Sequence, residues 1–278
     1  MTGCTQTHEI TDAQRDTFAR MVRGRTLGEF VFDVHAHTCD GWGLCCIYDG
    51  SREALQHETR MLGSTGMAVS AVCAISGIDF RRANDALARD IGKDDNKLAA
   101  YVGIDIRHGR SLVDDTAAYI ARGFKGGKLY TRWGVPYDDD AYHPVLDYLN
   151  QLGAPVLAHC WGGRDITQLV GAARKFPRIR FIAAHTGSPD VDTYIRLAKE
   201  TDNLYIDTAY SRGQRGLIEY VVQRLGSEKL LFGSDAALFS AAQQVARVVA
   251  ARISDEDRRN ILGRNALRLF KHLRPDGD

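Results

Sequence analysis

The feature that most constrains the fold is a regular alternation of short apolar segments with amphipathic segments. Eight apolar runs have the composition of buried strands, and helical patterns follow them. The apolar runs are residues 30–37, 68–75, 98–104, 123–130, 155–159, 179–185, 204–207 and 230–235. The helical patterns are residues 51–62, 81–91, 112–122, 140–152, 166–175, 190–200, 216–225, 241–253 and 255–273. This order predicts an α/β fold, a (β/α)8 TIM barrel. An open doubly wound sheet is the alternative, but the count of eight favours the barrel.

One further helix is expected before the first strand. Residues 11–23 begin with a Thr or Asp cap and carry apolar residues at helical spacing. We therefore predict a short N-terminal helical extension over residues 1–29 and a barrel domain over residues 30–278. No Pro- or Ser-rich linker divides the chain, and 44% hydrophobic residues suffice for one large core.

Charge and hydropathy exclude several classes of partner. The formal net charge of +1 gives no general attraction to nucleic acid or to an anionic membrane. No apolar run approaches the roughly 18 residues of a membrane span. Residues 1–9 are polar and lack a signal-peptide pattern, so a cytoplasmic location is expected. Six scattered cysteines are best interpreted as free thiols. A small-molecule substrate is the expected partner, and a homodimer is compatible with the sequence.

Two histidines stand where the first apolar run ends. Side chains alternate along a strand, so His35 and His37 point to the same face. Two imidazoles on one face can chelate a transition metal such as zinc. Other polar residues end later runs, and in a barrel these ends meet at one mouth. A single histidine there would more often be a core residue, but several converging on one mouth indicate a metal site. The residues at the later ends are Lys128, Tyr130, His159, His185, Asp207 and Asp235.

Three short motifs resemble those of the amidohydrolase superfamily. They are Asp-Val-His-Ala-His at 33–37, Leu-Phe-Gly-Ser-Asp at 231–235 and Ile-Leu-Gly-Arg-Asn-Ala at 261–266. Together with the histidines that end runs five and six, they are similar to the amidohydrolase 2 branch. That branch contains metal-dependent hydrolases and non-oxidative decarboxylases of the aminocarboxymuconate-semialdehyde type. The resemblance covers residues 30–272, and the order of its motifs makes it specific.

The resemblance implies a role for each residue at the mouth. The metal ligands would be His35, His37, His159 and Asp235, with zinc the expected ion. Asp235 would also accept and return a proton of metal-activated water. His185 would polarise the substrate or bind a second metal. The site would then hold one divalent ion, or two.

Lys128 is the residue on which the number of metals depends. In parts of the superfamily a lysine on strand four is carboxylated and bridges two metals, whereas the decarboxylase-like members usually lack it. The alternatives are a free ammonium that binds a substrate carboxylate and a side chain that reaches solvent. We favour the carboxylate-binding role, because Tyr130 and Arg132 are close in sequence and suit an acidic group. With Trp161, they form the predicted substrate-binding set.

These residues support three hypotheses about function. The first is a metal-dependent hydrolase that acts on a C–N or C–O bond of a small, anionic compound. The second is a metal-dependent non-oxidative decarboxylase, or a hydratase, on the same scaffold. The third is a non-catalytic ligand-binding barrel, which the complete set of metal ligands argues against.

Overall fold

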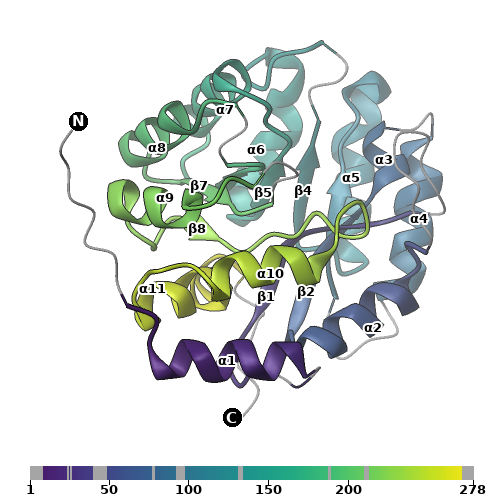
Figure 1. The fold of residues 1–278 in the computed structure, drawn as a ribbon. Coiled ribbons are helices and arrows are strands. Elements are labelled where there is room, and N and C mark those ends of the chain that lie inside the picture. Colours follow the sequence, from purple (N-terminus) through teal and green to yellow (C-terminus); the bar gives the residue numbers. More distant parts are fainter. Residues whose placement is uncertain are drawn as a thin grey trace.

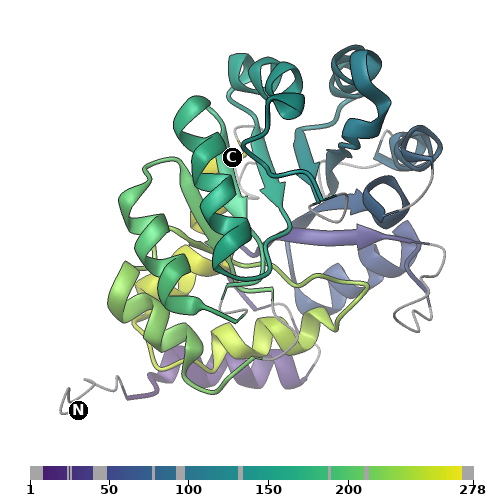
Figure 2. The same cartoon turned by 90° about the horizontal axis from the view of Figure 1, so that it is seen from above.

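The computed structural model describes residues 9–23, 25, 27–39, 49–76, 79–91, 98–130, 134–186, 189–209 and 213–270. Eight strands form one parallel sheet in the order β1 to β8 (Figure 1). The strands are β1 Phe32–Thr38, β2 Gly66–Ala71, β3 Leu98–Gly103, β4 Gly126–Leu129, β5 Pro155–Ala158, β6 Arg180–Ala183, β7 Leu204–Asp207 and β8 Leu230–Leu231. The helices lie outside the strands in the view from above (Figure 2). The predicted (β/α)8 barrel is therefore confirmed.

The sheet closes between its first and last strands. Val34 N donates to Phe232 O at 2.9 Å, and Asp235 N donates to His35 O at 2.7 Å. Ala36 and Ala236 form a parallel bridge. These bonds lie beyond the two residues of β8, so the predicted run 230–235 still lies beside β1. Barrel closure therefore brings Asp235 next to the two histidines of β1.

The helices follow the predicted order with shifted ends. The α-helices are α1 Asp12–Val22, α2 Arg52–Leu62, α3 Val72–Ser76, α4 Phe80–Ile91, α5 Leu112–Ala121, α6 His143–Leu152, α7 Gly163–Lys175, α8 Val191–Glu200, α9 Leu217–Leu225, α10 Ala241–Val249, α11 Asp255–Arg259 and α12 Asn265–Leu269. Shorter helical segments are η1 Ile106–Ser111, η3 Asp140–Tyr142 and the π-helical η4 Asn260–Arg264. Side-chain caps such as Ser51 and Ser240 explain several starts, and Gly63 and Gly153 in left-handed conformations explain two ends.

Two apolar layers hold the barrel together. Inside it, Phe32, Val34, Tyr101 and Leu157 belong to one buried cluster contributed by several strands. A larger cluster joins the outward residues of the strands to the apolar faces of the helices. β1 contains a register shift between Asp33 and Ala36, where one extra residue interrupts its pairing with β2. Such a bulge changes which side chains face inward.

The predicted second strand, residues 68–75, is wrong at its end. β2 stops at Ala71, and α3 begins at the next residue. Thr38, the last residue of β1, pairs with Ala71, and β3 pairs with β2 only as far as Val69. Beyond Ala71 a strand would have no backbone partner, so the chain satisfies its peptide groups in a helix instead.

The predicted extension, residues 1–29, is described from residue 9 onward. Its helix α1 lies beside α10 and α11 at the bottom of Figure 1. Gln14 Nε2 donates to Ala251 O at 2.6 Å, and Thr11 Oγ1 donates to Asp255 at 3.0 Å. The buried guanidinium of Arg258 donates to Glu29 at 2.8 Å. These bonds fasten the extension to the C-terminal helices.

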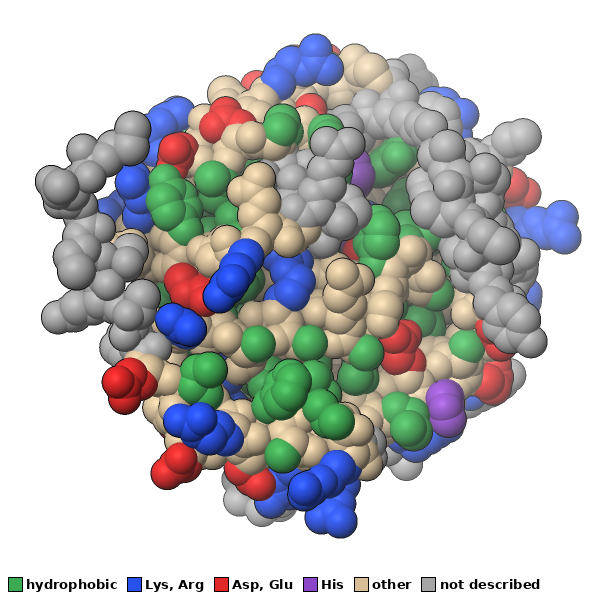
Figure 3. Space-filling view, in the orientation of Figure 1, with side chains coloured by type: hydrophobic (Ala, Val, Ile, Leu, Met, Phe, Trp, Pro, Cys, Tyr) green, Lys and Arg blue, Asp and Glu red, His purple; other side chains and the backbone are tan. Residues whose placement is uncertain are grey.

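The outer surface carries charged groups of both signs, with apolar side chains between them on the face shown in Figure 3. None of the described helices combines the length and the apolar character that crossing a bilayer requires. A homodimer stays a prediction.

Candidate metal centre

The end of β1 supplies two of the predicted metal ligands. His35 is fully buried and His37 is 3% exposed. Their rings lie edge to face, with centroids 5.1 Å apart. The bulge in β1 lets Val34 stay in the interior cluster while His35, the next residue, reaches the interior groups Asp207 and Lys128. The two histidines thus lie on the same face, as predicted, but the strand that carries them is irregular because of the bulge.

Asp235 completes a group of three donor atoms. His35, His37 and Asp235 each place a ligand atom within 4.8 Å of the other two, and no other described group of His, Cys, Asp or Glu does so. Asp235 Oδ1 lies 3.0 Å from His37 Nε2 and 3.4 Å from His35 Nε2. Three of the four predicted ligands therefore meet at one point.

Hydrogen bonds on the far side of each ring show which nitrogen faces this point. His35 Nδ1 lies 2.8 Å from Asp207 Oδ2, and His37 Nδ1 lies 3.3 Å from the Ser70 carbonyl oxygen. A carboxylate only accepts, so His35 Nδ1 carries the proton and His35 Nε2 presents a lone pair. His37 Nδ1 also lies 3.0 Å from the Ser70 hydroxyl, which can donate or accept, and a proton on Nδ1 satisfies both Ser70 contacts. Asp235 Oδ1 is buried and accepts no well-aligned hydrogen bond from the described residues, although His37 Nε2 lies 3.0 Å away. Lone pairs that converge on a buried carboxylate oxygen suit a divalent cation.

The β1–β8 junction holds Asp235 in place. Asp33 Oδ1 accepts from His35 N at 2.9 Å and from Ser234 N at 3.0 Å, and Asp33 Oδ2 accepts from the Ser234 hydroxyl. Burial raises the pKa of Asp33 to about 7, against the opposing effect of these bonds. Asp235 itself has a positive φ of 60°, which the surrounding bonds maintain. The Asp33, His35 and Asp235 positions of the motifs are thus physically connected.

His185 and His159 form a second pair beside the first. His185 Nδ1 lies 3.1 Å from Ala209 O, and its Nε2 lies 3.1 Å from His159 Nδ1. His185 therefore donates through Nδ1 and accepts at Nε2 from His159, which leaves His159 Nε2 with a lone pair. Burial lowers the pKa of His159 well below its ordinary value, and the nearby His185 and Lys128 lower it further. Ligation of a metal by His159 stays a prediction, because its donor atoms lie outside the three-residue group.

Lys128 lies inside the site. Its side chain is 1% exposed, so the alternative in which it reaches solvent is wrong. Its Nζ donates to His35 Nε2 at 3.1 Å. Burial lowers the pKa of Lys128 from 10.5 to about 8, although Asp235 and Asp207 oppose the change. At neutral pH the ammonium form is therefore still favoured beside the three donor atoms.

The remaining predicted residues are placed less deeply. The ring of Tyr130 lies against His159, with centroids 4.7 Å apart. Trp161 is 45% exposed, and its ring centroid lies 5.8 Å from that of His185. Trp161 therefore stands at the rim of the site, with part of its side chain exposed to solvent. Arg132 lies outside the described residues.

Asp207 was assigned no role from the sequence, although it ends the seventh strand. It is fully buried and contacts both His35 and the backbone of His185. Burial raises the pKa of Asp207 to about 6, with His185 opposing the change. Its position at a strand end was a signal, but its partner His35 lies on a strand far away in the sequence.

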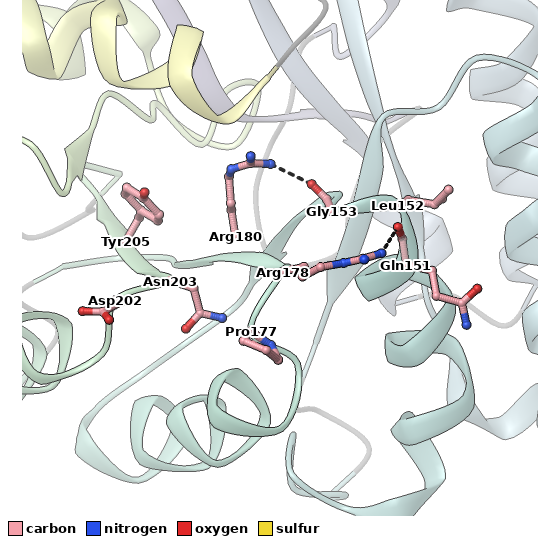
Figure 4. Close-up of a pocket in the computed structure, with 9 residues that line it drawn as sticks. All are labelled: Gln151, Leu152, Gly153, Pro177, Arg178, Arg180, Asp202, Asn203 and Tyr205. Atoms are coloured by element: carbon pink, nitrogen blue, oxygen red, sulfur yellow. Dashed lines mark hydrogen bonds between the residues drawn. The ribbon is translucent and has the colours of Figure 1, made fainter.

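A large surface cavity of about 620 Å³ lies at the opposite end of the barrel (Figure 4). It is lined by the segments that lead into β5, β6 and β7 and by the first residues of β6 and β7, including Gln151, Arg178, Arg180 and Asn203. Arg178 donates to the carbonyl of Asn150, and Arg180 donates to that of Gly153. Both arginines thus satisfy backbone groups near the end of α6, and this cavity contains none of the metal-centre residues.

The fold and the site together define a (β/α)8 barrel with a group of side chains that could hold a metal ion, His35, His37 and Asp235, at its C-terminal mouth. The family model described as Amidohydrolase matches residues 32–271, so the chain belongs to the amidohydrolase 2 family. The resemblance inferred from the motifs is thereby confirmed. No curated protein matches the sequence.

Several solved structures share the fold. A 2,6-dihydroxybenzoate decarboxylase bound to 2,6-dihydroxybenzoate is 18% identical, with a TM-score of 0.72, and the match covers 88% of this chain and 98% of that one. A dihydroxybenzoic acid decarboxylase from a Polaromonas species, with bound manganese and 2-nitroresorcinol, is 17% identical, with a TM-score of 0.69 and coverages of 89% and 98%. A probable 2-pyrone-4,6-dicarboxylic acid hydrolase from Acinetobacter baumannii is 15% identical, with a TM-score of 0.67 and coverages of 87% and 99%.

Proposed function

We propose that this protein is a metal-dependent enzyme that removes carbon dioxide from a small cyclic carboxylic acid without an oxidant. The observation that carries the proposal is the buried ammonium of Lys128 beside the donor atoms of His35, His37 and Asp235. A cation in this position complements a substrate carboxylate at the metal centre. The two decarboxylases named above have the same fold, and they support ranking decarboxylation ahead of hydrolysis.

The chain's own residues supply binding and proton transfer. A divalent ion held by His35, His37 and Asp235, with His159 as the proposed fourth ligand, would act as a Lewis acid toward an oxygen of the substrate. Lys128 would bind the carboxylate of the acid. The exposed face of Trp161 would stack on a planar ring.

Asp235 is the proposed proton-transfer group. In the decarboxylation the bond between the ring carbon and the carboxyl carbon breaks, carbon dioxide leaves, and the ring carbon takes a proton. Asp235 would take a proton from water and pass it to that carbon. His185, whose Nδ1 proton is bonded to Ala209 O, would have to take up a proton at Nε2 before it could donate a hydrogen bond to oxygen as negative charge develops there. Both side chains are buried, so bulk water does not compete for these contacts.

Hydrolysis of a C–O or C–N bond is the second candidate, and the Asp235 carboxylate favours it. A carboxylate with a buried oxygen that accepts no well-aligned hydrogen bond can accept a proton from water as readily as return one. The fold shared with a probable 2-pyrone-4,6-dicarboxylic acid hydrolase supports the same class of acidic, cyclic substrate. The two candidates therefore differ in the bond that breaks.

The test is an assay of metal-loaded protein against a panel that includes 2,6-dihydroxybenzoate and 2-pyrone-4,6-dicarboxylate. Carbon dioxide release and ring absorbance are followed together. We expect one equivalent of carbon dioxide for each equivalent of acid consumed. Consumption of an acid without carbon dioxide would establish the hydrolase instead, and no turnover of any cyclic acid would refute both candidates.

A further inference from the structure

The buried carboxylate of Asp207 joins two histidines that come from different strands. Its Oδ2 lies 2.8 Å from His35 Nδ1. Its Oδ1 accepts from His185 N at 2.9 Å and from Ala209 N at 3.1 Å. Oδ1 is thus committed to two backbone donors, and Oδ2 is the only oxygen left to bond His35.

The two neighbours of His35 determine where its proton sits. An ionised carboxylate only accepts hydrogen bonds, and Asp207 lies at Nδ1. An ammonium only donates, and Lys128 Nζ lies 3.1 Å from Nε2. Both contacts select the neutral imidazole with its proton on Nδ1. In that tautomer Nε2 has a lone pair, and Nε2 is the nitrogen that faces Asp235 Oδ1.

We infer that Asp207 is a positioning residue that fixes the metal-binding tautomer of His35 and ties it to the segment carrying His185. The second connection is equally direct. Ala209, whose N–H is held by Asp207, accepts from His185 Nδ1 through its carbonyl oxygen at 3.1 Å. His185 has a positive φ of 63°, and the bond from its N–H to Asp207 helps to hold that conformation.

The Asp207→Asn substitution separates this role from simple packing. Asparagine has the same shape, and its single oxygen is needed at the Oδ1 position for the two backbone N–H groups. Its NH₂ group must then face His35 Nδ1 as a donor. This arrangement selects the opposite tautomer, with the proton on Nε2, where Asp235 can accept it and the Lys128 ammonium must turn away. A protonated Nε2 cannot bind a metal. The fold keeps its backbone contacts while the metal site loses a ligand.

The inference rests on the metal-binding part of the proposed function and is independent of the reaction. Nitrogen-15 NMR of the metal-free protein reports the His35 tautomer directly, with His35→Asn used to assign the signal. We expect Nδ1–H in the wild type and Nε2–H in Asp207→Asn. Titration with Zn²⁺ against a competing chelator should show affinity weakened by about 10- to 100-fold in the variant.

Asp105→Asn is the matched control. Asp105 is also a buried carboxylate that accepts a backbone N–H, but it bonds Arg107 and makes no hydrogen bond to His35, His37, His185 or Asp235 among the described residues. Its amide keeps the shape of the side chain away from the metal centre, so Zn²⁺ affinity should change by less than about threefold. Equal losses in both variants, or an unchanged Asp207→Asn tautomer, would overturn the inference. If Asp207→Asn does not fold, an Nε2–H tautomer in the wild type would overturn it.

Discussion

Replacing Lys128 by methionine should stabilise the metal-free protein. The lysine is buried beside His35, and its ammonium is held there without a carboxylate in direct contact among the described residues. Methionine has an unbranched apolar side chain of similar length, so Lys128→Met fills the same space without the charge. We therefore expect a higher free energy of unfolding for the variant.

The magnitude follows from the pKa of Lys128. Burial lowers this pKa from 10.5 to about 8, and each pKa unit corresponds to about 1.4 kcal/mol. Holding the ammonium in the folded protein at neutral pH thus costs about 3 kcal/mol. The substitution also removes the donor to His35 Nε2, a loss of about 1 to 2 kcal/mol. The expected net gain is about 1 to 2 kcal/mol.

The pH dependence of the gain has a definite sign. Because the folded pKa lies below the unfolded one, the unfolded wild-type chain binds more protons between about pH 8 and 10.5. Wild-type stability contributed by this group therefore rises with pH across that window. The advantage of Lys128→Met should be full below about pH 8 and should shrink as the pH approaches 10.5.

The assay is urea denaturation in the presence of a chelator, at about pH 7 and about pH 10. Lys125→Met is the control, because Lys125 is an exposed lysine just before β4 and should change stability by no more than about 0.5 kcal/mol. A Lys128→Met variant that is no more stable at neutral pH, or whose advantage is equal at both pH values, would refute the reasoning.

Four further predictions concern the metal centre. Purified protein should contain a divalent metal and lose activity on exhaustive chelation; full activity without metal would contradict this. Asp235→Asn should lower turnover by about 10²- to 10⁴-fold in a folded protein, whereas Asp202→Asn, at the far end of the barrel, should not; steady-state kinetics of both variants decide. Lys128→Ala should keep the wild-type metal content and raise KM for an acidic substrate; two equivalents in the wild type and one in the variant would instead identify a carboxylated bridge. Gly233→Ala should cost about 1 to 3 kcal/mol of stability and weaken metal binding, because its Cβ would lie 3.0 Å from that of His35; denaturation and metal titration measure both effects.

The local pattern of the sequence determined the fold and the position of the site along the chain. Apolar runs alternating with amphipathic helices require a parallel sheet covered by helices, and strand ends in such a barrel converge. This is why the sequence alone predicts that His35, His37 and Asp235 lie together. The motifs that identified the family contain the residues at these strand ends.

Tertiary structure decided where strands stop and how the ligands are oriented. The run after Ala71 is as apolar as the strand before it, and only the lengths of β1 and β3 show that no partner remains for it. The bulge in β1 places the side chains of both Val34 and His35 inside the barrel. It is a feature of the pairing between β1 and β2. A local pattern contains no information about the length of a neighbouring strand.

The environments of Lys128 and Asp207 were likewise beyond the sequence. Strand periodicity allowed Lys128 to reach solvent, substrate or metal, and only its contact with His35 shows that it is buried within the site. Asp207, on β7, contacts His35 on β1, from a position 172 residues away in the chain. Side-chain alternation along a strand determines the face on which a residue lies. Barrel closure determines which residues it contacts there, and these contacts set the tautomers and the pKa values.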